Sequence, residues 1–578
     1  MGSLTHSVQF NSVVQASRAA AKGVASYEPA SSVSTVKFHM NRGLVPVGEH
    51  PPKIRTRANN TASDAINDEG LTKSPLKPAY GPQFSFIFFS TQTKMMKIAI
   101  LVLSGIAVAY CQGSADTACS LLQSELGDNV SFPGSAAYAE AIAHFEPTSS
   151  QNSTCSVAPT SANEVATILK IVGREDIRAP FAVKGSGHAN NVGHSSTVGV
   201  QIALSGFTDV SYDPEASTAT FGPGLSFDEI YEYLEQFNVS VVGARAAGVG
   251  ACWSCLGGGY SWITNQYGLA IDNIVSLDVV LPNGTFVTVT EAAHPDLMFG
   301  LRGGLNNFGI VTSFTVKAYP LSSVWGGIIV YNVDDSAGED PVARAIADFS
   351  LNNEDKKSQL NAGFTITGGQ SLWQVILFHD GPTIPDVFQP FLQIPNNSSN
   401  LVEGGSFTEF LSLLNVLGDT IPGGFYDVVP IVHYTEPLIS AFKTQANLTY
   451  TQAISDNRSI STVLVNLELF HGMFQHSVPS AYPHSPCREV TPCNPWILFD
   501  DTSDFEYFQG ALKDLSKVIQ DKAIEEGESK ADDLRYPNYA LEGTPLELMY
   551  GESLPRLREI RAAVDPENVM GLTGGWKL

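Results

Sequence analysis

The chain has 578 residues, of which 43% are hydrophobic, so it is long enough for two or more domains with sizeable cores. Its formal net charge of −25 argues against a nucleic-acid-binding protein, which would present a basic surface. The charge is uneven: residues 1–113 hold 11 basic and 5 acidic residues, whereas the remainder holds 22 basic and 53 acidic ones. The first hundred residues are therefore a different kind of sequence from the rest.

Residues 1–94 are rich in Ser, Ala, Pro and Asn and show no hydrophobic period, so we expect disorder, or an extension upstream of the true start. Lysines then precede an apolar run of about fourteen residues, which is typical of a secretory signal peptide over residues 95–113. The run is short for a membrane-spanning helix, which needs about 20 residues. We expect translation to begin at Met95 or Met96 and the product to be secreted. A signal anchor, or an organelle transit peptide in residues 1–45, is the alternative.

The first half of the remaining chain alternates predicted helices and strands. Residues 116–172 are expected to be helical, with an amphipathic helix over 163–171 that Ser161 or Asn163 would cap. Further predicted elements are strands over 180–183, 199–204 and 218–221, a capped helix over 226–237, and a hairpin around 282–284. Residues 294–320 predict a short helix, a polar turn and a strand.

A glycine-rich turn, Lys184-Gly185-Ser186-Gly187-His188, follows the strand over 180–183. Glycines allow the backbone to approach a ligand closely, and successive N–H groups in such a turn form a concavity that binds anions. A strand, such a turn and one histidine together indicate a phosphorylated cofactor. The alternative is a glycine-rich hairpin with a surface histidine. Asn190 stands where a third glycine would complete G-x-G-x-x-G, so a Rossmann domain is unsupported.

The second half, from about residue 324 to 530, predicts an α+β domain with one sheet and helices on one face. Apolar runs that predict strands lie at 326–331, 372–378, 463–470 and 496–499, and a long helix is predicted over 505–525. The C-terminal segment predicts one helix, over 554–564. No internal repeat, P-loop or G-x-S-x-G nucleophile motif is present.

The cysteines and the glycosylation sequons support the secretory route. Removal of Cys111 with the signal peptide would leave six cysteines, an even number that permits disulfides. We expect Cys119 to pair with Cys155, and Cys487 to pair with Cys493. Cys252 and Cys255 form a C-x-x-C in a glycine-rich turn, for which we favour a structural role, while a redox role or a local disulfide stays open. In the acidic part of the chain, eight sequons for N-glycosylation begin at Asn129, Asn152, Asn238, Asn283, Asn396, Asn397, Asn447 and Asn457.

The ordered blocks KGSGH, GVQIALSGF, GGGYSWITNQYGLAIDN, PDLMFGLRGGLNNFGIVTSF, YPNYA and DPENVMGLTGGWKL resemble the berberine-bridge-enzyme-like branch of FAD-linked oxidases. The sequence as a whole is similar to those of the secreted fungal members of this branch. The resemblance covers about residues 116–578 and implies an α+β, two-domain PCMH-type FAD-binding fold whose substrate domain is an antiparallel sheet covered by helices. It implies an FAD-binding domain over 114–323, a substrate domain over 324–530, and a segment, 531–578, that returns to the FAD domain.

What the resemblance implies for the cofactor is a bound FAD, tethered covalently through His188. The position of a second tether in some relatives is Ala246 here, so we expect the link through His188 only. The residues expected to border FAD are Lys184, Gly185, Ser186, Gly187, His188, Ala189, Gly257, Gly258, Gly259, Asp272, Asn273, Ile310, Val311 and Asn538. No metal site is expected, because His471, His476 and His484 match no firm metal motif.

The implied activity is oxidation of an alcohol, an amine or an activated C–H of a small, secondary metabolite, by hydride transfer to flavin with O2 as the expected acceptor. The candidate catalytic residues are Glu468, His471, Tyr482 and Tyr539, with His471 slightly preferred because an imidazole titrates near neutral pH. The alternatives are a carbohydrate oxidase of the same fold and an inactive flavin-binding secreted protein. We expect a monomer without nucleic-acid partners or stable membrane association.

Overall fold

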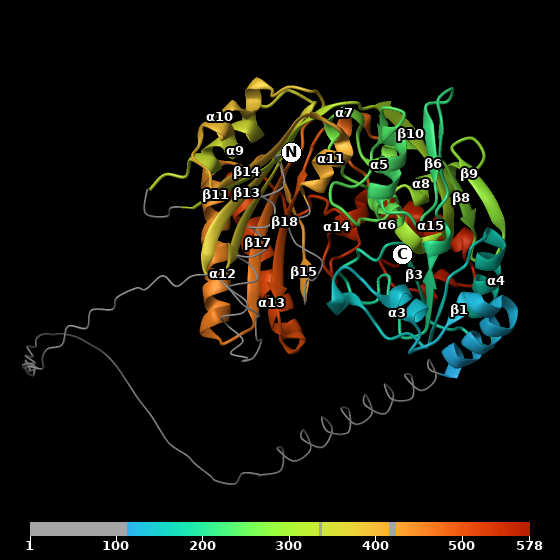
Figure 1. Ribbon diagram of the computed structural model, residues 1–578. Coiled ribbons are helices and arrows are strands. Elements are labelled where there is room, and N and C mark those ends of the chain that lie inside the picture. Colours follow the sequence, from blue (N-terminus) through green and yellow to red (C-terminus); the bar gives the residue numbers. More distant parts are fainter. Residues whose placement is uncertain (1–112, 334–337, 415–422) are drawn as a thin grey trace, which may run out of the picture. The chain divides into compact units, whose positions relative to one another are not determined.

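The computed structural model describes residues 113–333, 338–414 and 423–578, which fall within one compact unit (Figure 1). The predicted signal peptide and the residues before it lie outside the described residues. Within the described residues the strands form three sheets, and helices pack against them. No helix in these ranges combines the length and the hydropathy needed to cross a membrane. The mixture of helices and mainly antiparallel sheets agrees with the predicted α+β class.

The first sheet carries the strand that leads into the glycine-rich turn. Its strand order is β1-β2-β4-β3, with β2, β4 and β3 parallel to one another. The strands are β1 (Val130–Ser131), β2 (Cys155–Val157), β3 (Phe181–Lys184) and β4 (Val200–Ala203). The helix α4 (Ala162–Val172) covers this sheet and begins at Ser161, whose side chain accepts a hydrogen bond from the Glu164 N–H, as predicted.

The second sheet has six strands in the order β5-β6-β10-β8-β9, with β7 paired to β10. The strands are β5 (Val210–Asp213), β6 (Thr218–Phe221), β7 (Val239–Val241), β8 (Ile274–Val280), β9 (Phe286–Thr290) and β10 (Ile310–Pro320). The helix α5 (Phe227–Glu235) begins with a capping box between Ser226 and Glu229. Short helices connect these strands: α6 (Ala251–Gly257), α7 (Thr264–Tyr267) and α8 (Pro295–Leu301).

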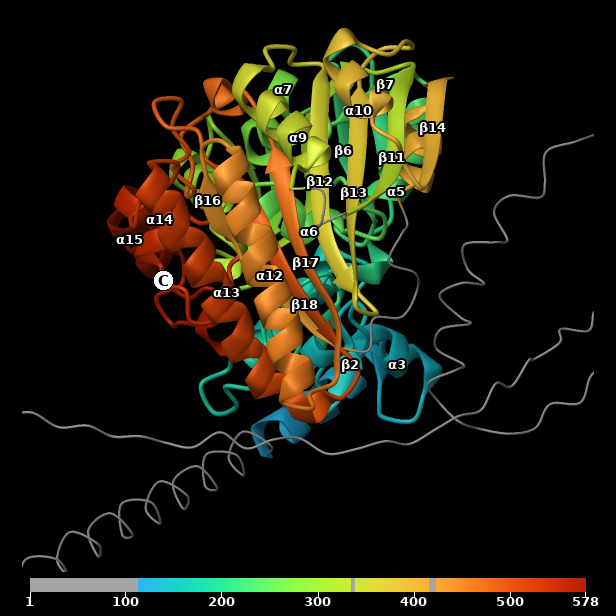
Figure 2. The same ribbon diagram turned by 90° about the vertical axis from the view of Figure 1, so that its left-hand side faces the viewer.

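The third sheet is antiparallel, with strand order β14-β11-β13-β12-β17-β18-β15 and β16 paired to β18. The strands are β11 (Val324–Asn332), β12 (Ser358–Thr367), β13 (Gln370–His379), β14 (Ser398–Gly405), β15 (Gly424–Tyr426), β16 (Val429–Ile431), β17 (Ile460–Leu469) and β18 (Thr491–Phe499). Two long helices, α12 (Glu436–Ser455) and α13 (Phe505–Glu526), lie across one face of it (Figure 2). The predicted boundary at residue 323 falls between β10 and β11.

Alternation along these strands separates a helix-covered face from a face that looks toward the first half of the chain. On β17, Val463, Val465 and Leu467 pack into the core beneath the helices. The residues that alternate with them, Leu464, Asn466 and Glu468, face a cavity. The remaining helices on this half are α9 (Pro341–Asn352), α10 (Gln389–Gln393) and α11 (Phe407–Ser412).

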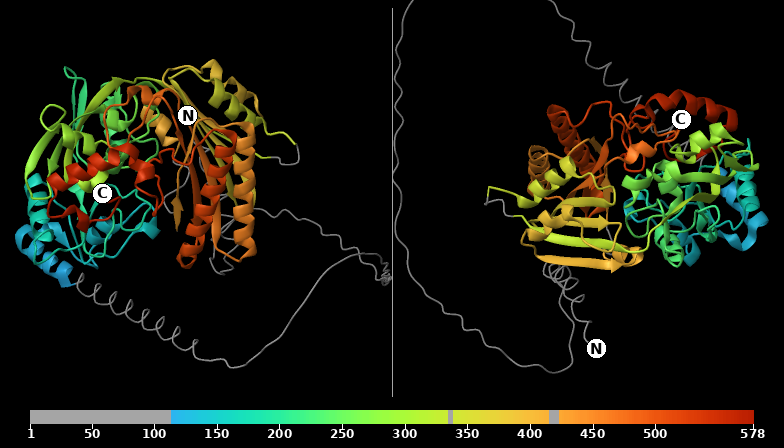
Figure 3. Two further views of the ribbon diagram at one scale, coloured as in Figure 1. Left: turned by 180° about the vertical axis from the view of Figure 1, so that it is seen from behind. Right: turned by 90° about the horizontal axis from the view of Figure 1, so that it is seen from above.

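The C-terminal segment lies against the first half of the chain (Figure 3). Its helices are α14 (Glu547–Tyr550) and α15 (Leu554–Val564), and α15 packs against α8. Trp576, near the chain end, donates from its indole N–H to the Pro537 carbonyl, and its own carbonyl accepts from Asn307. These contacts fix residues 536–539 beside the cavity.

The cysteines agree with the sequence predictions only in part. Cys119 and Cys155 form the predicted disulfide. The predicted Cys487–Cys493 disulfide is wrong: both thiols are free, with Cys487 exposed and Cys493 buried in β18. Cys252 and Cys255 are also free, and they lie in the helix α6 instead of the predicted turn.

Candidate active site

A large cavity lies between the glycine-rich turn and the open face of the third sheet. Its volume is about 280 Å³. One wall is the turn with the loop and helix over residues 244–254, the opposite wall is the sheet, and residues 536–539 close one side. The cavity therefore collects residues from all three predicted segments of the chain.

The wall formed by residues 185–189 offers unused backbone donors. The N–H groups of residues 186–189 make no hydrogen bond to an acceptor in the described part of the chain. The turn is held from behind: the Phe145 N–H donates to the Gly187 carbonyl at 3.0 Å, and Lys184 Nζ donates to the Glu140 carbonyl at 2.9 Å. Gly187 has φ +86°, a conformation that favours glycine. Free N–H groups in a fixed turn fit a bound phosphate oxygen.

Asn190, which replaces the third glycine of the dinucleotide motif, has a structural role. Its side-chain amide donates to the Tyr426 carbonyl at 2.9 Å, which ties the turn to strand β15. The side chain of Asn191 donates to the Ala540 carbonyl and accepts from the Glu542 N–H. The two asparagines thus connect the turn to the sheet half and to the C-terminal segment.

His188 lies in the wall of the cavity with its ring stacked on Phe145, the ring centroids being 4.3 Å apart. Burial lowers the pKa of His188 to about 4. The imidazole is therefore neutral at physiological pH and keeps a lone pair on one ring nitrogen. The Tyr426 hydroxyl donates to the His188 carbonyl at 3.2 Å, which fixes the backbone at this point.

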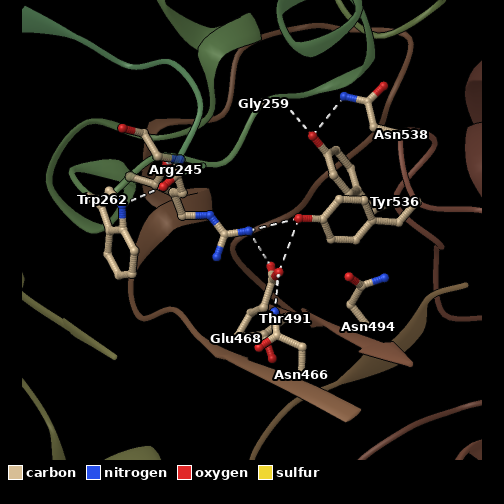
Figure 4. Close-up of polar contacts among 12 residues, drawn as sticks. Arg245, Gly259, Trp262, Asn466, Glu468, Thr491, Asn494, Tyr536 and Asn538 are labelled. Carbon is tan, nitrogen blue, oxygen red and sulfur yellow. Dashed lines mark hydrogen bonds and ion pairs between the residues drawn. The ribbon is translucent and has the colours of Figure 1, made fainter. Parts of the chain in front are cut away.

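A buried ion pair joins the loop of the first wall to the sheet (Figure 4). Arg245 Nη2 donates to Glu468 Oε2 at 2.6 Å, and the two side chains are 8% and 1% exposed. The same Nη2 lies 3.0 Å from the Tyr539 hydroxyl, which in turn donates to Glu468 Oε1 at 3.1 Å. Asn466 donates to Glu468 Oε1 at 3.3 Å. One negative charge is thus shared by four side chains. Arg245 comes from a loop, Asn466 and Glu468 from β17, and Tyr539 from the C-terminal segment.

Burial dominates the titration of this network. It raises the pKa of Glu468, and the charge of Arg245 opposes that shift. Burial also raises the pKa of Tyr539, and the neighbouring Glu468 carboxylate adds to the rise. For Arg245 burial alone would lower the pKa, but Glu468 and Tyr539 together raise it, so the guanidinium stays charged. The arrangement is a phenol hydrogen-bonded to a carboxylate, with a permanent cation bonded to both.

The predicted glycines 257–259 support the cavity from behind. An added Cβ at Gly257 would collide with the Asn538 side chain, and one at Gly258 would meet Tyr536 at 2.6 Å. The Gly259 N–H donates to the Tyr536 hydroxyl at 3.0 Å, and Asn538 donates to the same hydroxyl at 2.8 Å (Figure 4). Tyr536 and Asn538 line the cavity, and the glycines allow these side chains to approach.

The comparisons agree with this geometry. Residues 153–290 match the family model described as FAD binding domain. The chain is 36% identical over 303 residues to an FAD-dependent monooxygenase of Aspergillus calidoustus, covering 51% of this chain and 56% of that protein. Its structure is similar to a xylooligosaccharide oxidase from Myceliophthora thermophila in complex with xylobiose, with a TM-score of 0.64, 20% identity, and 78% and 98% of the two chains covered. The berberine bridge enzyme from Eschscholzia californica gives a TM-score of 0.64 at 17% identity, with 78% and 97% covered.

Residues 153–290 are thus similar to an FAD binding domain, and the chain has the berberine bridge enzyme-like fold. The matched stretch includes the glycine-rich turn, His188 and Arg245. The resemblance and the fold class predicted from the sequence are thereby confirmed. The matches span about half of the length of the first curated relatives.

Several residues that the sequence predicted for this FAD-binding fold lie away from the cavity. Asp272 is buried and hydrogen-bonded to His484 Nε2 at 2.9 Å, and Asn273 donates to the Leu269 carbonyl. Ile310 and Val311 lie in strand β10, within the core. Their expected contacts with FAD receive no support from the cavity lining.

The four catalytic candidates separate in the same way. Glu468 and Tyr539 line the cavity and are bonded to each other. His471 is exposed, at the start of the loop after β17, and Tyr482 is buried against His484 outside the cavity lining. The slight preference for His471 is therefore replaced by the Glu468–Tyr539 pair.

Sequence reasoning missed Arg245, Asn361, Gln374, Asn466 and Trp496, which also line the cavity. A signal existed for two of the sheet residues: apolar and polar residues alternate in β17 from Val465 to Leu469, so Asn466 and Glu468 share one face. No comparable signal marked Arg245, because its partner Glu468 is 223 positions away.

Proposed function

We propose that the chain is an FAD-dependent oxidoreductase that takes a hydride and a proton from an alcohol, an amine or an activated C–H of a small metabolite, with O2 as the final acceptor. The observation that carries the proposal is one cavity with two complementary walls. One wall has unused N–H groups and a neutral histidine, and the other has a carboxylate bonded to a phenol.

The residues of the turn fit FAD. The N–H groups of residues 186–189 would hold the negatively charged diphosphate of FAD. They are available for it because no acceptor in the described chain bonds to them. His188, neutral and fixed by Phe145, would carry the covalent link through its free ring nitrogen. Ala246 has no thiol to add a second link. Bound FAD supplies a hydride acceptor.

The Glu468–Tyr539 pair would receive the substrate proton. Tyr539 is the less buried residue of the two, so its hydroxyl would meet the substrate, and Glu468 would accept the phenolic proton across their 3.1 Å hydrogen bond. Arg245 balances the negative charge wherever the proton lies, since its Nη2 contacts both oxygens. Asn466 orients the carboxylate from the other side.

Acid precipitation of the purified chain tests the cofactor assignment. Yellow colour should remain with the precipitate, and a tryptic peptide containing His188 should carry the mass of FAD. His188→Ala should release the colour to the supernatant while the fold, measured by circular dichroism, is kept. Colour in the supernatant of the unsubstituted chain would refute the covalent link, and absence of flavin would refute the function.

Secretion with glycosylation is part of the proposal. Six of the eight sequon asparagines are exposed: Asn152, Asn238, Asn283, Asn396, Asn397 and Asn457. Asn447 lies within helix α12 and donates to the Lys443 carbonyl, so we expect it to stay unmodified. Treatment of the product of a eukaryotic host with an endoglycosidase should lower its mass, and a product without glycan in the medium would contradict this part.

A further inference from the structure

The cavity face of the third sheet contains side-chain amides without partners. Asn361 on β12 is 9% exposed and lines the cavity, and its amide makes no hydrogen bond within the described residues. Gln374 on β13 also lines the cavity, and its side chain has no partner in the described ranges either. Covering a polar group without bonding to it costs free energy, so a ligand that lies over these amides gains affinity when it bonds to them.

The strand register places these amides around a gap. Gly363 on β12 pairs with Gln374 on one side and Asn466 on the other, and Asn361 lies two residues earlier on the same face. Diagonal neighbours on such a face have Cβ atoms about 7–8 Å apart, which describes Asn361 and Gln374. Because Gly363 has no side chain, the three amides surround a recess in the sheet. An added Cβ there would meet Leu464 Cδ1 at 2.9 Å.

The recess changes character from one side to the other. Asn361 pairs in register with Glu468 on β17 and with Ile376 on β13, and Ile376 pairs with Ile328 on β11. All four side chains line the cavity. A molecule lying across the strands would therefore meet the Glu468–Tyr539 pair at one end, amides in the middle and an apolar surface at the other end.

Among the described residues that line the cavity, none offers an unpaired charge to a ligand. Its cation Arg245 and its carboxylate Glu468 pair with each other at 2.6 Å. Burial keeps His188 neutral, and burial also raises the pKa of the Cys252 thiol to about 12. A charged molecule on this wall would lose its hydration without finding a counter-ion.

We propose that the recess formed by Asn361, Gly363, Gln374 and Asn466 selects an uncharged ring compound that carries two neighbouring oxygen functions, hydroxyl or carbonyl, which the amides of Asn361 and Gln374 bind. The inference rests on the proposed function in taking this cavity as the substrate site. A phenolic ring and a sugar ring both present this chemistry, so the test includes one of each.

The unsubstituted full-length holoprotein is titrated with catechol, xylobiose, benzoate and benzylamine, and binding is followed by quenching of tryptophan fluorescence and by perturbation of flavin absorbance. Catechol or xylobiose should bind at least about tenfold more tightly than the two charged probes, because a charge without a partner is costly here. Preference for catechol identifies an aromatic substrate, and preference for xylobiose identifies a carbohydrate. Equal or tighter binding of benzoate or benzylamine, or no saturable binding of either neutral probe, would overturn the proposal.

Variants locate the binding groups. Asn361→Leu and Gln374→Met should each weaken binding of the preferred neutral probe by about tenfold. That is the effect of losing one hydrogen bond and leaving a ligand group unpaired. Gly363→Ala should also weaken binding of this probe, because the added methyl group fills the recess. Gln370→Met is the matched control: Gln370 lies on the same strand, β13, but is exposed and away from the cavity, so this variant should bind the probe with unchanged affinity.

The comparison of neutral with charged probes uses the unsubstituted protein, so it decides the proposal even if a variant fails to fold. If Gln374→Met folds and binds the neutral probe normally, the amide assignment is wrong. Tryptophan quenching does not depend on flavin. A chain without flavin would therefore refute the proposed function while the comparison of probes still tests the recess.

Discussion

The two walls of the cavity offer different groups to a ligand. The wall over residues 185–189 presents main-chain N–H groups and one neutral ring, and its geometry depends on glycines. The sheet wall presents side chains, among them the Glu468 carboxylate that pairs with Arg245, and its geometry depends on strand register. A main-chain site tolerates most side-chain changes, whereas a side-chain site loses function with a single substitution. The contrast separates cofactor binding from chemistry in experiments.

The largest effect expected on the sheet wall is that of Glu468→Gln. Turnover should fall by about 10²–10⁴-fold, the usual contribution of a general base, because the amide cannot accept the proton from Tyr539. Covalent flavin, measured by absorbance after acid precipitation, should be unchanged. Glu403→Gln on β14, an exposed position of the same sheet, is the control for stability and turnover. Loss of flavin together with turnover would show that the two walls are not independent.

Arg245→Met should lower the free energy of unfolding by about 3–5 kcal/mol, because it leaves the Glu468 carboxylate buried without its cation. Urea denaturation measures the change. The double variant Arg245→Met/Glu468→Leu should recover part of the loss, since no charge then stays buried. The control Lys517→Met removes an exposed pair with Asp521, where both side chains are at least 60% exposed, and should cost about 1 kcal/mol or less. Equal losses for the two single variants would mean that the buried pair does not stabilise the sheet wall.

The sequence predicts features formed by neighbouring residues better than features formed by distant ones, and the two walls differ in this respect. The helix over 554–564 and the strand over 218–221 were predicted at the observed residues, because local periodicity specifies them. The glycine-rich turn and His188 were also recognisable, because they occupy consecutive positions. The Arg245–Glu468–Tyr539 network was not, because its members come from distant parts of the chain and meet only through the third sheet.

Two errors have definite physical causes. Cys252 and Cys255 were placed in a turn because glycines surround them, but residues 251–257 pack as a helix against the core. Cys487 and Cys493 were paired because they are close in sequence, yet Cys493 lies in β18 opposite Val429, with its side chain in the core beneath the helices. Burial on a strand face overrides closeness in sequence.

The disulfide stabilises the turn side of the molecule. Cys119 and Cys155 close a loop of 36 residues, and replacing both with serine should lower the free energy of unfolding by about 4 kcal/mol. The control Cys487→Ser changes an exposed free thiol on the sheet side and should leave stability within about 0.5 kcal/mol. Thermal unfolding with and without dithiothreitol measures both. A drop in the control, or none in the double variant, would contradict the disulfide assignment.

The smallest effect expected concerns Glu146, which lies where the two walls meet. It follows Phe145, the residue stacked on His188, and an added Cβ at Gly424 of β15 would lie 3.1 Å from its Oε2. Neither carboxylate oxygen has a hydrogen-bond partner in the described chain. Burial raises the pKa of Glu146 to about 7 from the ordinary 4.5. The folded state therefore binds this proton more tightly than the unfolded state, and stability is lost as pH rises from about 4.5 through about 7.

Glu146→Gln removes that dependence. The difference in free energy of unfolding between variant and unsubstituted chain, measured with urea, should shift in favour of the variant by up to about 3 kcal/mol between pH 4 and pH 8. The comparison across pH cancels any fixed cost of burying the amide. Glu403→Gln, exposed on β14, should show no such shift. If the difference for Glu146→Gln is the same at both pH values, the carboxyl is not buried unpaired, and the two walls meet through a contact other than this one.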